Sequence, residues 1–263
     1  GHWLLSCATP TDEAAQPPLF MGGWVTSLLD EHDYVPQITG TLPPGLRGRL
    51  YRNGPGLFER DGLRKRLLID GDGMVNAYFF DGSGVRFKNR FVHTDKWLEE
   101  EQAGRYVYDS WTTKAPDTGN IPHLSSQAGV SARVFAERLF AFDEVLPPYE
   151  LDPGSLATLG MPEFAHELPF SPHPKIVGDE WFHFGIDPQT GKLEVLVFDA
   201  QLAIVERRSL QLDGTRFAHD FYVTGRYIVV PLMPIQLDFA RLLEGASVWQ
   251  AYAWDPSLGT TYV

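Results

Sequence analysis

Residues 181–198 read WFHFGIDPQTGKLEVLVF and give the clearest indication of the fold class. Two runs rich in aromatic and branched residues, Trp181–Ile186 and Lys192–Phe198, flank the turn Asp187–Gly191. Proline fixes φ at the second position of such a turn, and glycine supplies the positive φ that closes it. The stretch therefore predicts a β-hairpin.

The same pattern recurs at two other places in the chain. Further hairpins are predicted for Ala77–Phe80 with Val85–Phe87 and for Gln250–Trp254 with Thr260–Val263. Repeated hairpins favour an all-β sandwich, barrel or propeller, although their spacing is too irregular to count blades. Helical patterns are confined to Thr94–Ala103 and Gln236–Glu244, where the second is typical of a surface helix lying on a sheet.

The 263 residues suffice for one sizeable core or two small ones. Residues 1–39 contain few alternating patterns and are predicted to form an N-terminal arm, with a short helix near Gly22–Glu31. Residues 40–263 are predicted to form the β domain. The last hairpin stops at Val263 within a strand pattern, which would leave an unpaired edge, so we expect the sequence to be truncated at its C-terminus.

Composition narrows the function classes. The chain is 43% hydrophobic and 21% charged, and its 22 basic and 34 acidic side chains give a net charge of −12, which disfavours nucleic-acid binding. Cys7 is the only cysteine, so an internal disulfide and a cysteine-rich metal site are excluded. No apolar run approaches the ~20 residues that span a bilayer, and no targeting signal is evident, which predicts a cytoplasmic protein.

Two of the eight histidines have unusual surroundings. His173 lies between prolines in Ser171–Lys175, and His219 lies in Phe217–Phe221, each just before a predicted strand. Such positions are rigid and could aim two imidazoles at a shared centre. Taken alone, either histidine is as a rule a structural, hydrogen-bonded residue, and the residues by themselves leave both interpretations open. Common zinc-protease, nucleotide-binding and hydrolase motifs are missing.

Five segments, in this order, resemble the motifs of the carotenoid cleavage oxygenase family. They are Tyr51–Gly56 with Asp70–Met74, then Asn89–Thr94, then Leu139–Glu144 with Pro148–Pro153, then His173–Lys175, and finally His219–Phe221. Any one of them would be weak evidence, whereas their common order makes the resemblance specific. It covers the chain from about Gly40 to Val263.

The resemblance implies a seven-bladed β-propeller, of which this chain covers roughly the first half. It implies Fe(2+) bound by four histidines, the first two being His173 and His219, with Glu144 accepting the other N–H of one imidazole. The implied reaction is the cleavage by O2 of a conjugated C=C bond into two carbonyl products. No third or fourth ligand motif precedes Val263, so the chain as given is expected to be inactive.

The substrate implied is an apolar polyene, a carotenoid or an apocarotenoid. Stilbene-cleaving members carry a lysine where this chain has Asp143, and an ionised aspartate cannot donate to a phenol, so stilbenes are the alternative. Asp143 and Phe91 are predicted to line the substrate tunnel, although Phe91 could equally be a core aromatic. A non-catalytic propeller that binds apolar ligands is the alternative from another class.

Carotenoid substrates live in membranes, so the resemblance also implies peripheral contact with a membrane. The candidate patch is Leu232–Ile235 with Leu237, Phe239 and Leu243. Burial of the same residues in the core is the competing interpretation. The sequence does not indicate an oligomeric state.

Overall fold

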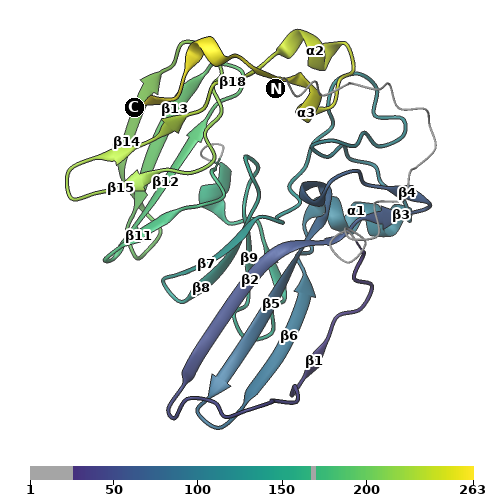
Figure 1. Cartoon of the computed structure of the whole chain (residues 1–263), viewed down its shortest axis with the longest axis vertical. Coiled ribbons are helices and arrows are strands. Elements are labelled where there is room, and N and C mark those ends of the chain that lie inside the picture. Colours follow the sequence, from purple (N-terminus) through teal and green to yellow (C-terminus); the bar gives the residue numbers. More distant parts are fainter. Residues whose placement is uncertain (1–25, 167–169) are drawn as a thin grey trace, which may run out of the picture.

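The computed structural model describes residues 26–166 and 170–263. In this part of the chain, three four-stranded antiparallel sheets follow one another in chain order along an arc (Figure 1). Long connections and short helices lie beyond one end of these sheets. The predicted all-β class is therefore confirmed.

The first sheet has the order β1 (Asp33–Tyr34), β6 (Val85–Phe91), β5 (Asp72–Asp81) and β2 (Arg47–Leu57). The predicted hairpin of β5 and β6 is confirmed by the pairing of Phe80 with Val85. β1 pairs with β6, so the predicted boundary at residue 40 falls inside this sheet. Residues 26–31 are not helical, and the rest of the helix expected near Gly22–Glu31 lies outside the described residues.

The second sheet has the order β10 (Thr158–Gly160), β9 (Tyr149–Leu151), β8 (Arg138–Phe142) and β7 (Ser131–Phe135). The third has the order β11 (Lys175–Val177), β12 (Glu180–Ile186), β13 (Lys192–Phe198) and β14 (Ile204–Gln211). In the third sheet Ile186 pairs with Leu193, which confirms the hairpin predicted from residues 181–198.

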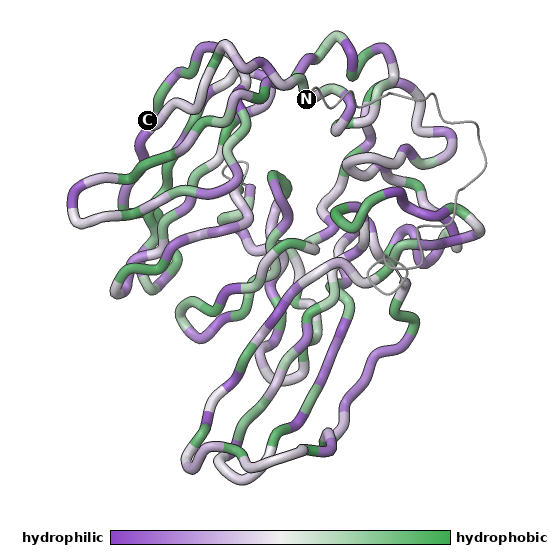
Figure 2. The backbone as a smooth tube through the Cα atoms, viewed as in Figure 1, coloured by the Kyte–Doolittle hydropathy of each residue, from purple (hydrophilic) through white to green (hydrophobic). Residues whose placement is uncertain are grey.

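The core lies between successive sheets. Val75 and Ala77 of β5 pack with Leu139 and Ala141 of β8, between the first and second sheets. An aromatic cluster joins the second sheet to the third, formed by Phe135, Phe140, Phe142, Phe164, Phe170, Trp181 and Phe198. Hydrophobic and hydrophilic segments alternate along these strands (Figure 2). Face-to-face packing of consecutive four-stranded sheets is the arrangement of propeller blades.

Shorter pairs complete the described strands. They are β3 (Glu59–Arg60) with β4 (Leu63–Arg64), β15 (Tyr222–Val223) with β16 (Ile228–Val229), β17 (Pro231–Leu232) with β20 (Thr261–Tyr262), and β18 (Ile235–Leu237) with β19 (Tyr252–Trp254). The third predicted hairpin is wrong, because β19 and β20 pair with different strands. Asp255 caps the 3-10 helix η4 (Pro256–Leu258), accepting from the backbone N–H of Ser257 at 2.9 Å, and the chain turns there toward β17.

The helices are short. α1 (Asp95–Ala103) confirms the first helical prediction, with Thr94 as its N-cap. The second is half right: Asp238 caps α2 (Phe239–Leu243), whereas Gln236 lies in β18. α3 (Val248–Ala251) and the 3-10 helices η2 (Leu68–Asp70) and η3 (Glu163–His166) complete the described helices. Within the described residues, none of the helices has the length and apolar character needed to cross a membrane.

Candidate metal centre

The candidate site is built from loops at the ends of strands. Glu144 follows β8, His173 precedes β11, and His219 precedes β15. His219 is 75 residues from Glu144 and 46 residues from His173 in the sequence. The structure brings both side chains into contact with that of His219. All three were predicted as site residues from the sequence.

The two imidazoles converge on one point. Nε2 of His173 lies 2.9 Å from Nε2 of His219. On the other side of its ring, Nδ1 of His219 lies 2.8 Å from Oε1 of Glu144. An ionised carboxylate only accepts, so Nδ1 of His219 carries the proton and the lone pair of its Nε2 faces His173. The carboxylate thereby fixes both the orientation and the tautomer of the ring.

Burial and charge act differently on the three groups. The hydrogen bond to Glu144 raises the pKa of His219. Burial lowers the pKa of His173, and the neighbouring His219 adds to that effect. Burial raises the pKa of Glu144, with the bond to His219 opposing it. His173 is therefore kept neutral, which is the form in which an imidazole can bind a metal.

Two contacts hold the histidine segments in place. Ser131 donates a hydrogen bond to the carbonyl of Pro172, the residue before His173. Nζ of Lys175 donates to Oδ1 of Asp220 at 2.6 Å, which ties the segment after His173 to the segment after His219. The sequence prediction missed this ion pair, although the opposite charges beside the two histidines were a signal for it.

Asp143 and Phe91, predicted to line a substrate tunnel, are both buried. The Asp143 carboxylate is buried against backbone N–H groups of residues 127, 128 and 144. Phe91 packs in a small core cluster with Leu57 and Met74. Neither residue belongs to the wall of the cavity described next.

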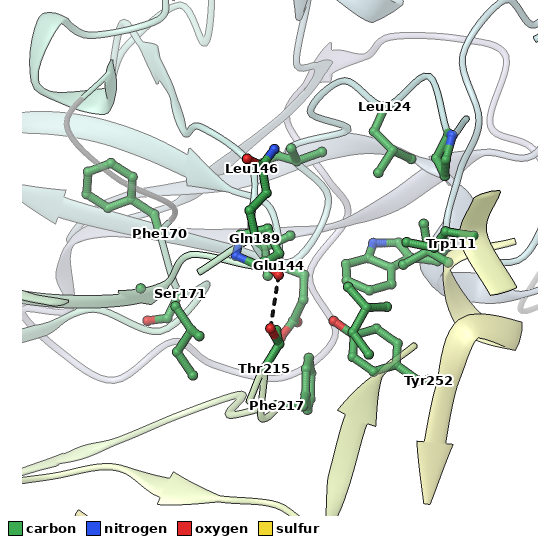
Figure 3. A pocket seen from close by; sticks show the side chains of 18 of the residues that line it. Trp111, Leu124, Glu144, Leu146, Phe170, Ser171, Gln189, Thr215, Phe217 and Tyr252 are labelled. Atoms are coloured by element: carbon green, nitrogen blue, oxygen red, sulfur yellow. Dashed lines mark hydrogen bonds between the residues drawn. The ribbon is translucent and has the colours of Figure 1, made fainter. Parts of the chain in front are cut away.

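A cavity of about 410 Å³ has Glu144, the partner of His219, in its wall (Figure 3). Its wall is mainly apolar and includes Trp111, Leu124, Leu146, Phe217 and Tyr252, with Glu144 as its carboxylate nearest to His219. Phe217 and Ala218, immediately before His219, also line it. Trp111, Leu124, Leu146 and Phe217 come from loops and Tyr252 begins β19, so no periodic pattern in the sequence marked them as one wall. The size and lining suit an apolar small molecule.

The candidate patch for membrane contact is divided in the structure. Leu232 is buried in the core, whereas Leu237 and Phe239 line the cavity. Leu243 is 60% exposed, and nearby Trp249 is 56% exposed. The burial interpretation therefore holds for Leu232, whereas Leu243 of the predicted patch faces solvent on α2, with Trp249 on α3.

The two imidazoles fit a bound metal ion. Two nitrogen ligands ~2.1 Å from a metal and at right angles would lie about 3 Å apart, close to the observed separation. Imidazole is a suitable ligand for iron. Within residues 26–166 and 170–263, no group of three or more histidine, cysteine, aspartate or glutamate side chains is arranged to hold a metal. The described residues therefore bring together a pair of imidazoles and no larger group of this kind.

A model of the retinal pigment epithelial membrane protein family matches residues 25–263, almost the whole chain. The chain belongs to this family, the carotenoid cleavage oxygenases. It is 30% identical over 241 residues to apocarotenoid-15,15'-oxygenase of Synechocystis, covering 84% of the chain and 49% of the relative. It is 28% identical to resveratrol cleavage oxygenase 1 of Aspergillus fumigatus over 228 residues, covering 84% of the chain and 45% of that protein.

Solved structures of the carotenoid cleavage oxygenases agree with this fold. A cobalt-substituted Synechocystis apocarotenoid oxygenase superimposes with a TM-score of 0.82 at 30% identity, covering 89% of the chain and 53% of the relative. The chain thus spans about half the length of the relatives that it matches.

Proposed function

We propose that this chain is part of an iron(II)-dependent oxygenase that cleaves a conjugated C=C bond of a carotenoid or apocarotenoid into two carbonyl products. The observation that carries the proposal is the pair of Nε2 atoms 2.9 Å apart, with Glu144 behind one ring, in a member of the carotenoid cleavage oxygenases. A seven-bladed propeller is the architecture that we propose for the whole protein.

His173 and His219 would hold the ion, and iron(II) would supply the electrons that activate O2. The metal of the cobalt-substituted relative supports a metal site in this one. Glu144 keeps the proton on Nδ1 of His219, so that Nε2 stays free to bind. The Lys175–Asp220 ion pair restrains the two segments relative to each other.

The cavity beside Glu144 would receive the substrate. Its mainly apolar wall matches a polyene, and Trp111 and Tyr252 stack at 6.3 Å between ring centroids to form one side of it. Leu243 and Trp249, exposed on the adjoining short helices, are our candidates for contact with a membrane surface that delivers the substrate.

Stilbene cleavage is the second candidate, because the chain also resembles a resveratrol cleavage oxygenase. A phenolic substrate needs a polar partner in the cavity. Arg216 is the one cationic side chain among the described wall residues, and its guanidinium already donates to the carbonyls of Met233 and Gly259. The wall is mainly apolar, which suits a polyene, and Ser171, Gln189 and Thr215 are polar wall residues that a phenol could use.

The test uses the full-length natural protein, reconstituted with Fe(II) without oxygen and then given O2 with either an apocarotenoid or a stilbene. We expect carbonyl products from the apocarotenoid and none from the His219→Ala variant. Cleavage of the stilbene alone would favour the second candidate. A protein that binds the polyene yet retains no iron would instead be a non-catalytic binding module.

A further inference from the structure

Asp143 makes an unusual set of contacts directly beside Glu144. Its Oδ2 accepts from the backbone N–H of Gln127 at 2.7 Å and of Ala128 at 3.2 Å, and its Oδ1 accepts from the backbone N–H of Glu144 at 2.6 Å. One carboxylate thus bridges two chain segments, 127–128 and 143–144. Asp143 is only 1% exposed, so water does not compete for these hydrogen bonds.

The segment that Asp143 grips is itself firmly held. The Gln127 carbonyl accepts from Gly73 N–H at 2.8 Å, and its side chain donates to the Ile69 carbonyl at 3.2 Å. Nδ2 of Asn53 donates to the Ala128 carbonyl at 2.6 Å. Asp143 therefore connects the loop that carries Glu144 to the first sheet and its neighbouring loop.

The bond from the Glu144 N–H to Asp143 holds the backbone from which the Glu144 side chain extends. The residue follows the end of β8, and the described hydrogen bonds give its side chain His219 as a partner. A carboxylate on a loose loop would hold the imidazole poorly, because the strength of a hydrogen bond falls steeply with distance and angle. Orientation of metal-binding histidines by such outer partners commonly changes metal affinity 10- to 100-fold.

We propose that Asp143 is a positioning residue: by fixing the backbone at Glu144 it holds the Glu144 carboxylate against Nδ1 of His219 and so sets the ring that binds the metal. The consequence for metal binding rests on the proposed function. The consequence for the His219 ring does not, since it follows from the contacts alone.

Asparagine has nearly the same size and shape as aspartate, so it removes the charge and one hydrogen-bond acceptor without changing the volume of the side chain. Aspartate accepts on both oxygens, whereas asparagine accepts on one and presents an NH2 group on the other side. In Asp143→Asn that NH2 group must face either the Gln127 and Ala128 donors or the Glu144 donor. One side of the bridge is then lost while the packing is preserved.

The experiment compares Asp143→Asn, Asp143→Ala and Glu144→Gln with the wild type. Metal-free protein labelled with 15N-histidine reports by NMR which nitrogen of His219 carries the proton, and Co(2+) titration of the full-length natural protein reports affinity. Asp199→Ala is the chemically matched control, because Oδ1 of Asp199 accepts two backbone N–H groups in the distant turn between β13 and β14. Val75→Ala, in the core between the first two sheets, controls for lost stability.

We expect both Asp143 variants to lose the pure Nδ1–H form of His219 and to bind Co(2+) about 10- to 100-fold more weakly, with both controls unchanged. A folded Asp143→Asn protein with the wild-type tautomer would overturn the proposal. Failure of both Asp143 variants to fold would also overturn it, as evidence of a purely structural role. If Glu144→Gln leaves Co(2+) affinity unchanged, the proposed metal site fails, while the tautomer still decides the role of Asp143.

Discussion

His183 should make the fold sensitive to acid. It lies in β12 with 0% of its surface exposed, and neither of its ring nitrogens has a hydrogen-bond partner. Its ring centroid lies 4.3 Å from that of Trp181 and 4.9 Å from that of Phe170. Burial in this aromatic cluster lowers the pKa of His183 to about 3.

The sign and size of the effect follow from proton uptake. An unfolded histidine titrates near pH 6.5, whereas folded His183 stays neutral down to about pH 3. Between these values the unfolded state binds the extra proton, so stability is full above pH 6.5 and falls as the pH is lowered. Each pH unit below about 6.5 lowers the free energy of unfolding by about 1.4 kcal/mol. The fold is therefore less stable by roughly 2 kcal/mol at pH 5 than above pH 6.5.

The assay is urea unfolding at pH 7 and pH 5 for the wild type and for His183→Phe, which keeps a ring in the cluster but cannot be protonated. We expect the difference in unfolding free energy between the two pH values to shrink by about 2 kcal/mol in the variant. His166→Gln, at an exposed histidine, is the control and should resemble the wild type. An unchanged pH dependence in His183→Phe would refute the reasoning. Phe142 packs on His183 and directly precedes Asp143, so this cluster also supports the site.

Three other substitutions test separate parts of the structure. Glu144→Ala should weaken Co(2+) binding about 10- to 100-fold by calorimetry, because His219 loses the acceptor that orients it; unchanged affinity would contradict this. Lys96→Met should cost about 3–5 kcal/mol in urea unfolding, since buried Asp72 and Glu100 lose the ammonium 2.6 and 2.5 Å away; a neutral effect would show that the pair is dispensable. Thr94→Ala should lower stability by about 1 kcal/mol in thermal unfolding through loss of the α1 N-cap, and no change would count against the cap.

Local pattern predicted the parts of the fold that depend on neighbours in sequence. The hairpins at residues 77–87 and 181–198 and the helix after Thr94 are confirmed, because turn residues and a capping threonine specify them directly. The hairpin at residues 250–263 failed because β19 and β20 find partners in β18 and β17, a long-range choice that no local pattern records.

The sequence likewise indicated some residues of the candidate site and not others. The motif order indicated Glu144, His173 and His219, and the structure places them in contact. The tunnel role of Asp143 stays a prediction, and sequence adjacency to Glu144 did not reveal that its side chain turns back to the backbone of Gln127 and Ala128. The residues of the cavity wall could not be predicted from the sequence, because Trp111 and Tyr252 are far apart in the chain and stack only in the folded structure.

The central claim is that His173 and His219 bind one metal ion together. The direct measurement is the titration of the metal-free, full-length natural protein with Co(2+), followed by visible absorbance, for the wild type and for His173→Ala and His219→Ala. We predict one ion bound per chain in the wild type and loss of that binding in each variant. Retention of the same absorbance spectrum and affinity in both variants would contradict the account.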